Sequence, residues 1–256
     1  MIALRKPRYI ARFAASDSDV AAAQALRYLA FVANEPPGAA PQQGFDADPF
    51  DAICRHVLIE DTRDAEATPH RLVACFRILP LGGGSDIARS YSAQYYDLDA
   101  LEQFEGKMVE MGRFCLHPQV HDPDILRIAW GAMTRFVDEE GVEMLFGCSS
   151  FHGTDTAEYL DAFAMLKHRH LAPARWKPRV KAPNVFKFAA RLRRKPDARR
   201  AALKMPPLLK TYLLMGGWVS DHAVVDRDLN TLHVFTGLEI KAIPPARARL
   251  LRALPV

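Results

Sequence analysis

The sequence predicts an α/β (α+β) protein with a mixed central sheet flanked by helices. The first observation is the order of its periodic segments: a strand, a helix, three strands, a helix, a strand, a helix and, after a basic region, a last strand. The second is that a long helical segment joins two of these strands, which is typical of a parallel crossover beside an antiparallel meander. The chain has 256 residues, no internal repeat and no clean linker, so we expect one domain over 1–256.

The amino-terminal part predicts the first strand and the first helix. A strand is expected at 8–14, and a helix rich in Ala and Leu opens at Asp17 or Ser18, whose short polar side chains suit an N-cap. The stretch EPPGAAPQQG, 35–44, contains too much proline and glycine for regular structure.

The middle of the chain predicts the meander and the crossover helix. Strands are expected at 53–61 and 71–80, where apolar residues dominate. The glycines at 82–84 predict a turn, and a short helix is expected within 90–104. A longer helix over 123–140 carries apolar residues at helical spacing.

Two further strands flank this helix, at 109–118 and 143–150. The next helix is expected to be capped by Thr154 or Asp155. A last strand is expected near 231–240, after the basic region.

The composition excludes several classes of protein. No run of about 18 uncharged apolar residues could span a membrane, and the amino-terminal segment lacks the apolar stretch of a secretory signal. We therefore expect a cytoplasmic protein, with peripheral contact at the inner face of the cell membrane as a further option. The cysteines lie far apart without C-x-x-C spacing, which favours buried, reduced thiols at Cys54, Cys75, Cys115 and Cys148.

No motif for a metal, a nucleotide or a serine nucleophile is complete. The glycines at 82–84 follow a strand, but neither a Gly-Lys-Ser/Thr sequence nor G-x-G-x-x-G completes a phosphate-binding loop. There is no G-x-S-x-G, and no pair of histidines has H-E-x-x-H spacing. We expect no metal and no tightly bound cofactor.

The net charge of +4 hides a strong asymmetry. Between Lys167 and Lys204 there are 14 Lys or Arg and one acid, so this basic segment, 167–204, has a net charge of +13 and the remainder −9. The segment could dock an acidic protein, lie against an anionic membrane or be a solvated face. Nucleic-acid binding would also explain RLRRKPDARR, but it leaves the buried charges described next without a role.

The segment VEMGRFCLHP, 109–118, places Glu110 and Arg113 inside an apolar strand. Burying either charge alone costs several kcal/mol, on the order of a domain's net stability. Residues three apart point to opposite faces of a regular strand. Gly112, which lies between them, suits a bulge that would re-aim one of the two side chains.

Other charged residues fit the same environment. Arg27 and Phe31 share a face of the first helix, and Arg77 lies inside the apolar strand ACFRILP. The segment FDADPFDA carries two further acids before a strand. We expect one paired, semi-buried polar cluster of Arg27, Asp48, Asp51, Arg77, Glu110 and Arg113.

Four motifs in these segments carry a resemblance to a known family. They are Arg27-x-x-x-Phe31, Asp48-x-Phe50-Asp51, Arg77-x-Leu79-Pro80 and Glu110-x-x-Arg113-Phe114. This series resembles that of the acyl-homoserine lactone synthases, which have the fold of the Gcn5-related N-acetyltransferases and take acyl groups from acyl carrier protein. The resemblance implies a Gcn5-related N-acetyltransferase-like sheet with a bulged fourth strand.

The remainder is similar to another branch of that superfamily. VEMGRFCLHP and above all MPPLLKTYLLMGGWVSDHAVVDRDLNTLHVF, 205–235, resemble the L-ornithine N(alpha)-acyltransferases of bacterial ornithine-lipid synthesis, some of which are labelled hemolysin-like. The resemblance covers the chain from about Ile10 to Phe235. It implies transfer of a 3-hydroxyacyl chain from acyl carrier protein to the α-amine of L-ornithine, which gives lyso-ornithine lipid and holo-acyl carrier protein.

The proposed reaction assigns roles to single residues. Glu110 would be the general base, directly or through a water, and the resemblance supports this choice; Tyr159, on the helix after the fifth strand, is a candidate to protonate the departing thiolate. The predicted catalytic residues are Glu110, Arg113 and Tyr159. The predicted substrate-binding residues are Arg27, Phe31, Asp48, Asp51, Arg77 and Ser149: the arginines for acidic partners and the acceptor's carboxylate, and Asp48 or Asp51 for its side-chain ammonium.

One departure from the superfamily bears on the acyl donor. Acetyl-CoA-dependent members carry a glycine-containing loop after the fourth strand, whose amides bind pyrophosphate. Here that place reads HPQVHDPDILR, 117–127, with no glycine and with Asp122 and Asp124 where an anion would bind. We therefore expect an acyl carrier protein, with its 4'-phosphopantetheine thioester, as co-substrate.

Three alternatives stay open. An acyl-homoserine lactone synthase would use S-adenosylmethionine as acceptor, and the long carboxy-terminal part argues against it. An N-acyltransferase for another amino acid would differ at only a few side chains of the acceptor site. A basic nucleic-acid-binding module is the non-enzymatic alternative.

Overall fold

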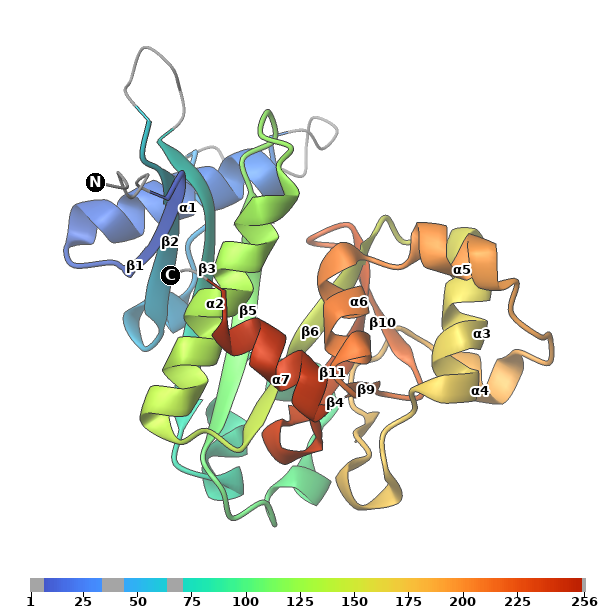
Figure 1. Cartoon of the computed structure of the whole chain (residues 1–256). Helices are drawn as coiled ribbons and strands as arrows, with labels where there is room; N and C mark the ends of the chain where they lie inside the picture. Colours follow the sequence, from blue (N-terminus) through green and yellow to red (C-terminus); the bar gives the residue numbers. More distant parts are fainter. Residues whose placement is uncertain (1–6, 34–43, 64–70, 255–256) are drawn as a thin grey trace. The chain divides into compact units, whose positions relative to one another are not determined.

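The computed structural model describes residues 7–33, 44–63 and 71–254 (Figure 1). The chain forms two compact units. Unit 1 contains the described residues up to Leu79, together with Met111–Gly141 and the residues from Pro245 onward. Unit 2 contains Pro80–Glu110 and Val142–Pro244. The single-domain expectation stays a prediction, and the predicted irregular stretch 35–44 lies, apart from Gly44, outside the described residues.

The strands of unit 1 form the predicted antiparallel meander. Strand β1 pairs with β2 and β2 with β3, both antiparallel, and β5 follows β3 in the sheet. Their apolar segments make the strands, as periodicity predicts. The bounds are β1 (Tyr9–Phe13), β2 (Arg55–Asp61), β3 (Leu72–Leu81) and β5 (Met108–Leu116), the last of which continues from unit 2 into unit 1.

Three helices belong to unit 1: α1 (Asp17–Phe31), α2 (Pro123–Glu140) and α7 (Pro245–Arg252). The N-cap of α1 is Ser16, whose side chain accepts from the Asp19 amide, so the predicted cap at Asp17 or Ser18 is wrong by one or two residues. Helix α2 has the predicted bounds, because Asp122 caps its start and left-handed Gly141 ends it. Helix α1 packs on β2, and α2 packs on β1 and α7.

A small apolar core holds α1 on the sheet of unit 1. Ala23 and Leu26 of α1 lie against Leu58 of β2 and against Cys75 and Cys115 of the neighbouring strands. None of the four cysteines forms a disulfide, but Cys54 and Cys148 are only half-buried, in contrast to the prediction that all four are buried.

Unit 2 contains a sheet of mixed direction. Strand β5 pairs with β6 in parallel through Met108–Glu110, as the predicted crossover requires, and β6 pairs with β11 antiparallel over nine residues. The strand order continues from β11 to β10 and β8, while β9 also pairs with β11. The bounds are β6 (Met144–His152), β8 (Val185–Phe186), β9 (Trp218–Val219), β10 (Ala223–Asp226) and β11 (Thr231–Glu239).

The prediction of a helix within 90–104 is wrong. The segment forms two short 3-10 helices, Ser92–Gln94 and Asp99–Leu101, on either side of β4 (Tyr96–Asp97), which pairs with β7 (Arg179–Val180). Tyr96 is buried, and its hydroxyl donates to the carbonyl of His233 at 2.8 Å. These long-range contacts, which no local pattern contains, outweigh the helical preference of the segment.

The helices of unit 2 are short: α3 (Leu160–Arg169), α4 (Phe188–Arg191), α5 (Ala198–Lys204) and α6 (Pro207–Leu214). Asp155, one of two predicted caps, begins a 3-10 helix that leads into α3. Helix α3 packs on α4 and α5 (Figure 1). Among the described residues, no helix is long and apolar enough to cross a membrane.

Candidate active site

Unit 1 contains a group of three arginines and three aspartates, which we call the Arg–Asp cluster. The arginines come from α1, β3 and β5, and the aspartates come from the segment that leads into β2. Five members are those predicted from the sequence, and Asp46 joins them. The members are Arg27, Arg77, Arg113, Asp46, Asp48 and Asp51.

Arg27 is the most deeply buried member, with 1% of its side chain exposed. Its Nη1 and Nη2 donate to the two carboxylate oxygens of Asp51, each at 2.7 Å. Its Nε lies 2.9 Å from Asp46 Oδ2 and donates to the Asp46 carbonyl. Because desolvated bidentate pairs are strong, Arg27 ties α1 firmly to the segment before β2.

Arg77 connects two of the aspartates and is also buried. Its Nη1 donates to Asp48 Oδ1 and to Asp51 Oδ1, both at 2.6 Å, and its Nη2 donates to Asp48 Oδ2 at 2.7 Å. The guanidinium carbon lies 5.4 Å from the ring centroid of Phe50. A single guanidinium therefore compensates charge on two carboxylates.

Arg113 forms the more accessible edge of the cluster. Its Nε donates to Asp46 Oδ2 at 3.1 Å, and its Nη2 donates to Asp48 Oδ2 at 3.2 Å. The exposed fractions of the Arg113 and Asp48 side chains are 12% and 18%, compared with 4% for Arg77. If the cluster contacts a small polar molecule, this edge is where it can do so.

The local sequence explains why the aspartates converge. Asp48 caps the short 3-10 helix Pro49–Ala52, and its Oδ1 accepts from the Phe50 amide at 2.9 Å. Asp51 Oδ2 reaches back to the Asp48 amide at 3.3 Å, which completes a capping box. The same carboxylates thus shape the turn and compensate the arginines.

The arginines decide the protonation of the cluster. Burial alone would raise the pKa values of Asp48 and Asp51, but hydrogen bonds from Arg77 and Arg27 outweigh it, and both pKa values lie below their usual range. Burial would lower the pKa of Arg27, but the hydrogen bond to Asp51 and the charge of Asp46 raise it. The buried ion pairs thus favour the charged forms of Arg27, Asp48 and Asp51.

The backbone of β5 has an unusual conformation at Arg113, next to Gly112. Arg113 has a φ of 54°, in the left-handed region that non-glycine residues rarely adopt. The bulge predicted at Gly112 stays a prediction. The ion pairs of Arg113 with Asp46 and Asp48 offset a strain on the order of 1–2 kcal/mol.

Two substitutions at Arg113 separate this strain from the ion pairs. Both Arg113→Ala and Arg113→Gly lose the contacts with Asp46 and Asp48, but only Ala keeps a Cβ at positive φ. We expect Arg113→Gly to have the higher free energy of unfolding by about 1 kcal/mol, measured by urea denaturation.

The matched control for this pair is Gly112→Ala, because a Cβ at Gly112 would meet no atom within 4 Å. We expect its free energy of unfolding to stay within about 0.5 kcal/mol of the unsubstituted protein. Equal stability of Arg113→Ala and Arg113→Gly would contradict the strained conformation.

Glu110, the sixth residue of the predicted cluster, belongs to unit 2, and its place in the cluster stays a prediction. With 4% exposure, it is buried. Its Oε1 accepts from the Ser92 amide at 2.8 Å and from Ser92 Oγ at 2.6 Å, and its Oε2 accepts from the Tyr91 amide at 2.8 Å. These donors hold the carboxylate in one orientation, as a general base requires.

Ser92 also contacts a thiol. Its Oγ lies 3.4 Å from Cys148 Sγ. A hydroxyl has a single proton, and the Ser92 proton is directed to Glu110 at 2.6 Å, so the Cys148 thiol is the donor to Ser92. Hydrogen bonds in unit 2 thus run from the Cys148 thiol to the Ser92 hydroxyl and from there to the Glu110 carboxylate.

Tyr159, the third predicted catalytic residue, lies in an apolar cluster of unit 2. Its ring packs edge-on against Phe151 at 5.0 Å between centroids, and its hydroxyl donates to the carbonyl of His152 at 2.6 Å. Burial, followed by the charge of Glu158, raises the pKa of Tyr159. A role in thiolate protonation stays a prediction, and it requires the hydroxyl to leave the His152 carbonyl.

Two predicted substrate-binding residues make packing or core contacts. Ser149 is 4% exposed, and its Oγ accepts from Thr236 Oγ1 at 2.9 Å, across the β6–β11 pair. Phe31 packs against the core of unit 1, on the helix face that also carries Arg27. Their binding roles stay predictions.

Three participants were not predicted from the sequence. Asp46 and Ser92 are described above, and Gln24 donates to Asp51 Oδ2 at 2.9 Å. A signal existed for two of them: Gln24 lies three residues before Arg27 on one helix face, and Asp46 begins the D-x-D-x-x-D spacing. Nothing local indicates that Ser92 contacts a residue 18 positions away.

The carboxylate of Asp122 caps the amino terminus of α2 and is bound by other side chains of the protein. Asp122 Oδ1 accepts from the Asp124 amide at 3.0 Å, while Oδ2 accepts from Arg8 at 2.7 Å and from the Tyr9 hydroxyl at 2.9 Å. The Asp124 amide is the first cause of the lowered pKa of Asp122, so this carboxylate is ionised at neutral pH. A negative charge of the chain itself therefore sits where a helix would otherwise attract an anion.

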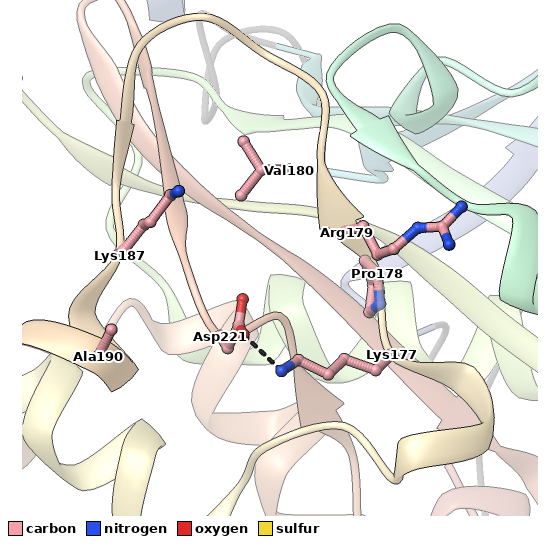
Figure 2. Close-up of a pocket in the computed structure, with 7 residues that line it drawn as sticks. All are labelled: Lys177, Pro178, Arg179, Val180, Lys187, Ala190 and Asp221. Atoms are coloured by element: carbon pink, nitrogen blue, oxygen red, sulfur yellow. Dashed lines mark ion pairs between the residues drawn. The ribbon is translucent and has the colours of Figure 1, made fainter.

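A cavity of unit 2 lies apart from all predicted site residues. It has a volume of about 260 Å³, and its lining includes Lys177, Arg179, Lys187 and Asp221. In Figure 2, Lys177 and Asp221 point toward each other, with 2.6 Å between Nζ and Oδ2. Within the described residues, no group of three or more His, Cys, Asp or Glu side chains could hold a metal ion.

Comparison with known families agrees with the mixed sheet. A model described as an acetyltransferase (GNAT) domain matches residues 26–131. The predicted fold class is confirmed, and the class of protein is an acyltransferase.

The relatives identify the family. The chain is 35% identical over 240 residues to an L-ornithine N(alpha)-acyltransferase of Rhodobacter capsulatus, which covers 92% of this chain and 91% of that relative. It is 30% identical to the protein of the same name from Brucella abortus, with coverages of 91% and 84%. The chain belongs to the L-ornithine N(alpha)-acyltransferase family.

Among solved structures, a CoA-dependent acyl-homoserine lactone synthase is similar at a TM-score of 0.48 and 13% identity, with coverages of 95% and 87%. At this level of similarity no functional inference follows.

Proposed function

We propose that this protein transfers a 3-hydroxyacyl chain from acyl carrier protein to the α-amine of L-ornithine, giving lyso-ornithine lipid and holo-acyl carrier protein. The assignment of ornithine as the acceptor rests on the name of the relatives, which align with about nine-tenths of this chain. Membership of an acyltransferase family favours this enzymatic function over the nucleic-acid-binding alternative.

The occupied start of α2 supports a carrier protein as donor. A CoA pyrophosphate bound there would meet the carboxylate of Asp122, which already caps the helix and pairs with Arg8. Two like charges at one helix terminus repel each other. A carrier protein presents only its pantetheine arm to the thioester site, so it avoids this repulsion.

The reaction needs a base, because the ornithine α-amine arrives mostly protonated at neutral pH. Glu110 takes that proton, directly or through a water, and the freed amine attacks the thioester carbonyl. The carbon–nitrogen bond forms, the carbon–sulfur bond breaks, and the nitrogen releases its second proton. The pantetheine thiolate takes a proton, for which Tyr159 is the candidate donor, and the proton released by nitrogen restores the tyrosine hydroxyl through water. The buried, oriented carboxylate of Glu110 supports this assignment.

The accessible edge of the Arg–Asp cluster supports a role in holding the acceptor. Arg113 is the candidate for the amino acid's carboxylate, and Asp48 is the candidate for the side-chain ammonium. Arg27, Arg77 and Asp51 are more deeply buried and already paired, so they act by fixing this edge. An unchanged ornithine affinity in Arg113→Ala would count against the carboxylate role.

The deciding experiment is acyl transfer by the purified protein from 3-hydroxyacyl-acyl carrier protein. Ornithine, lysine, glutamine, glycine and S-adenosylmethionine are offered separately, and products are identified by mass. We expect an amide with ornithine only. An acyl-homoserine lactone, or an amide with another amino acid, would replace this proposal with one of the two enzymatic alternatives.

Exchanging the donor in the same assay tests the carrier-protein assignment. We expect 3-hydroxyacyl-CoA to support much slower transfer than the carrier-protein thioester. Equal rates with both donors would contradict the argument from Asp122.

A further inference from the structure

The basic segment 167–204 contains two groups of cations that differ in their partners. Its first group is neutralised by acids of unit 2, and one of these pairs is drawn in Figure 2. Three of these pairs are Arg175–Glu239, Lys177–Asp221 and Arg179–Asp97, with nitrogen–oxygen distances of 2.9, 2.6 and 2.8 Å. Three more are Arg194–Asp161, Arg200–Asp197 and Lys204–Glu158, at 2.8, 3.9 and 3.2 Å. These basic side chains already form ion pairs within the protein.

The second group has no such acids. Arg191 at the end of α4, Arg193 and Lys195 in the following loop, and Arg199 in α5 are all exposed. None of the four makes an ion pair or a side-chain hydrogen bond with the residues that the structure describes. We call these four residues the α4–α5 patch.

An exposed apolar side chain lies beside one member of the patch, Arg199. Leu203 is 74% exposed and follows Arg199 by four residues in α5, so the two side chains share one face of the helix. Basic side chains around an exposed large apolar residue are the arrangement that binds at a lipid headgroup boundary.

We propose that the α4–α5 patch docks this protein on an anionic phospholipid surface, where lipid phosphates bind the four cations and Leu203 inserts at headgroup depth. A membrane suits these side chains better than an acidic protein does, because the cations are on long stems without fixed orientation and the surface field of a membrane needs no defined partner geometry. The inference depends only on these charges and Leu203, and not on the proposed reaction.

Vesicle co-sedimentation of the full chain tests the proposal. The probes are vesicles of phosphatidylcholine alone and vesicles in which about one lipid in three is phosphatidylglycerol. We expect binding only to the anionic vesicles, and release at about 0.5 M salt because exposed charges are then screened.

Substitutions at the patch should weaken this binding strongly. Each basic residue contributes about fivefold to partitioning, so the variant Arg191→Gln/Arg193→Gln/Lys195→Gln/Arg199→Gln should bind more than about 100-fold more weakly. Leu203→Ser should lose about tenfold. The patch side chains are exposed and unpaired, so we expect no loss of folding.

The control variant removes the same number of exposed cations elsewhere, each with an acidic neighbour. It is Arg89→Gln/Arg127→Gln/Arg135→Gln/Lys241→Gln. We expect it to keep most of the vesicle binding, because its sites lie outside the patch. An equal loss in both quadruple variants would mean that only net charge matters and would overturn the proposal.

Two further outcomes would also overturn it. One is that the unsubstituted protein does not sediment with anionic vesicles. The other is that the patch variant sediments normally but fails to saturate with acyl carrier protein in the transfer assay, which would make the patch a protein-docking surface. Transfer from soluble substrates is measured separately, so failure of the proposed function and failure of membrane docking are distinguishable.

Discussion

Replacing Glu110 with Gln is expected to lower kcat by about 10²–10⁴-fold, because the amide has no basic oxygen with which to remove the amine's proton. The side chain keeps its size, and its carbonyl oxygen can still accept from Ser92. Its NH₂ group faces a backbone donor, so we also expect the free energy of unfolding to fall by about 1–3 kcal/mol. Product formation is measured by mass, at a temperature where circular dichroism shows the variant folded.

Glu60→Gln is the matched control for this substitution. Glu60 is a comparably buried glutamate, but it lies in β2 and pairs with Arg12 at 2.7 Å and Arg71 at 3.4 Å. We expect this variant to lose stability while its kcat stays close to that of the unsubstituted protein. A Glu110→Gln enzyme with unchanged kcat would remove Glu110 from the role of base.

Replacing Arg77 with Met is expected to lower the free energy of unfolding by about 3–5 kcal/mol. Methionine keeps an apolar stem of similar length but leaves Asp48 without its two shortest hydrogen bonds and Asp51 without one. Urea denaturation measures the change. The control is Arg135→Met, which breaks an exposed pair with Glu139 and should cost no more than about 0.5 kcal/mol.

The pH dependence of stability follows from the same pairs. The folded-state pKa values of Asp48 and Asp51 are lower than those of the unfolded chain, which lie near 3.9. Their contribution is therefore fully present above about pH 4 and is lost as the pH falls through the folded-state values. Denaturation between pH 7 and pH 3 should show this loss, and Arg77→Met should show less of it. The same acid dependence in both proteins would mean that other carboxylates are responsible.

Much of the candidate site could be predicted because charged residues inside apolar strands are unusual in a sequence. A charge inside an apolar strand needs a partner, and this argument found Arg77, Arg113 and Glu110 without any structure. The position of a charged residue in an apolar strand does not indicate which residue is its partner. Glu110 was expected among the arginines, and the sequence did not indicate that its carboxylate accepts from Tyr91 and Ser92 of unit 2.

The sequence by itself determined the local features of this protein. The bounds of α2 and, to within two residues, the limits of β1, β2, β3, β5, β6 and β11 follow from hydrophobic period and caps, which act over a few residues. The motif series also determined the family.

Only the tertiary structure decided how distant groups combine. It converted the expected helix around Tyr96 into a strand flanked by 3-10 helices, gave Arg113 its left-handed backbone, and left the four cations of the α4–α5 patch without acids. The physical reason is common to all three. Burial and charge compensation join residues far apart in the chain, and their free energies exceed the local preferences that a sequence pattern records.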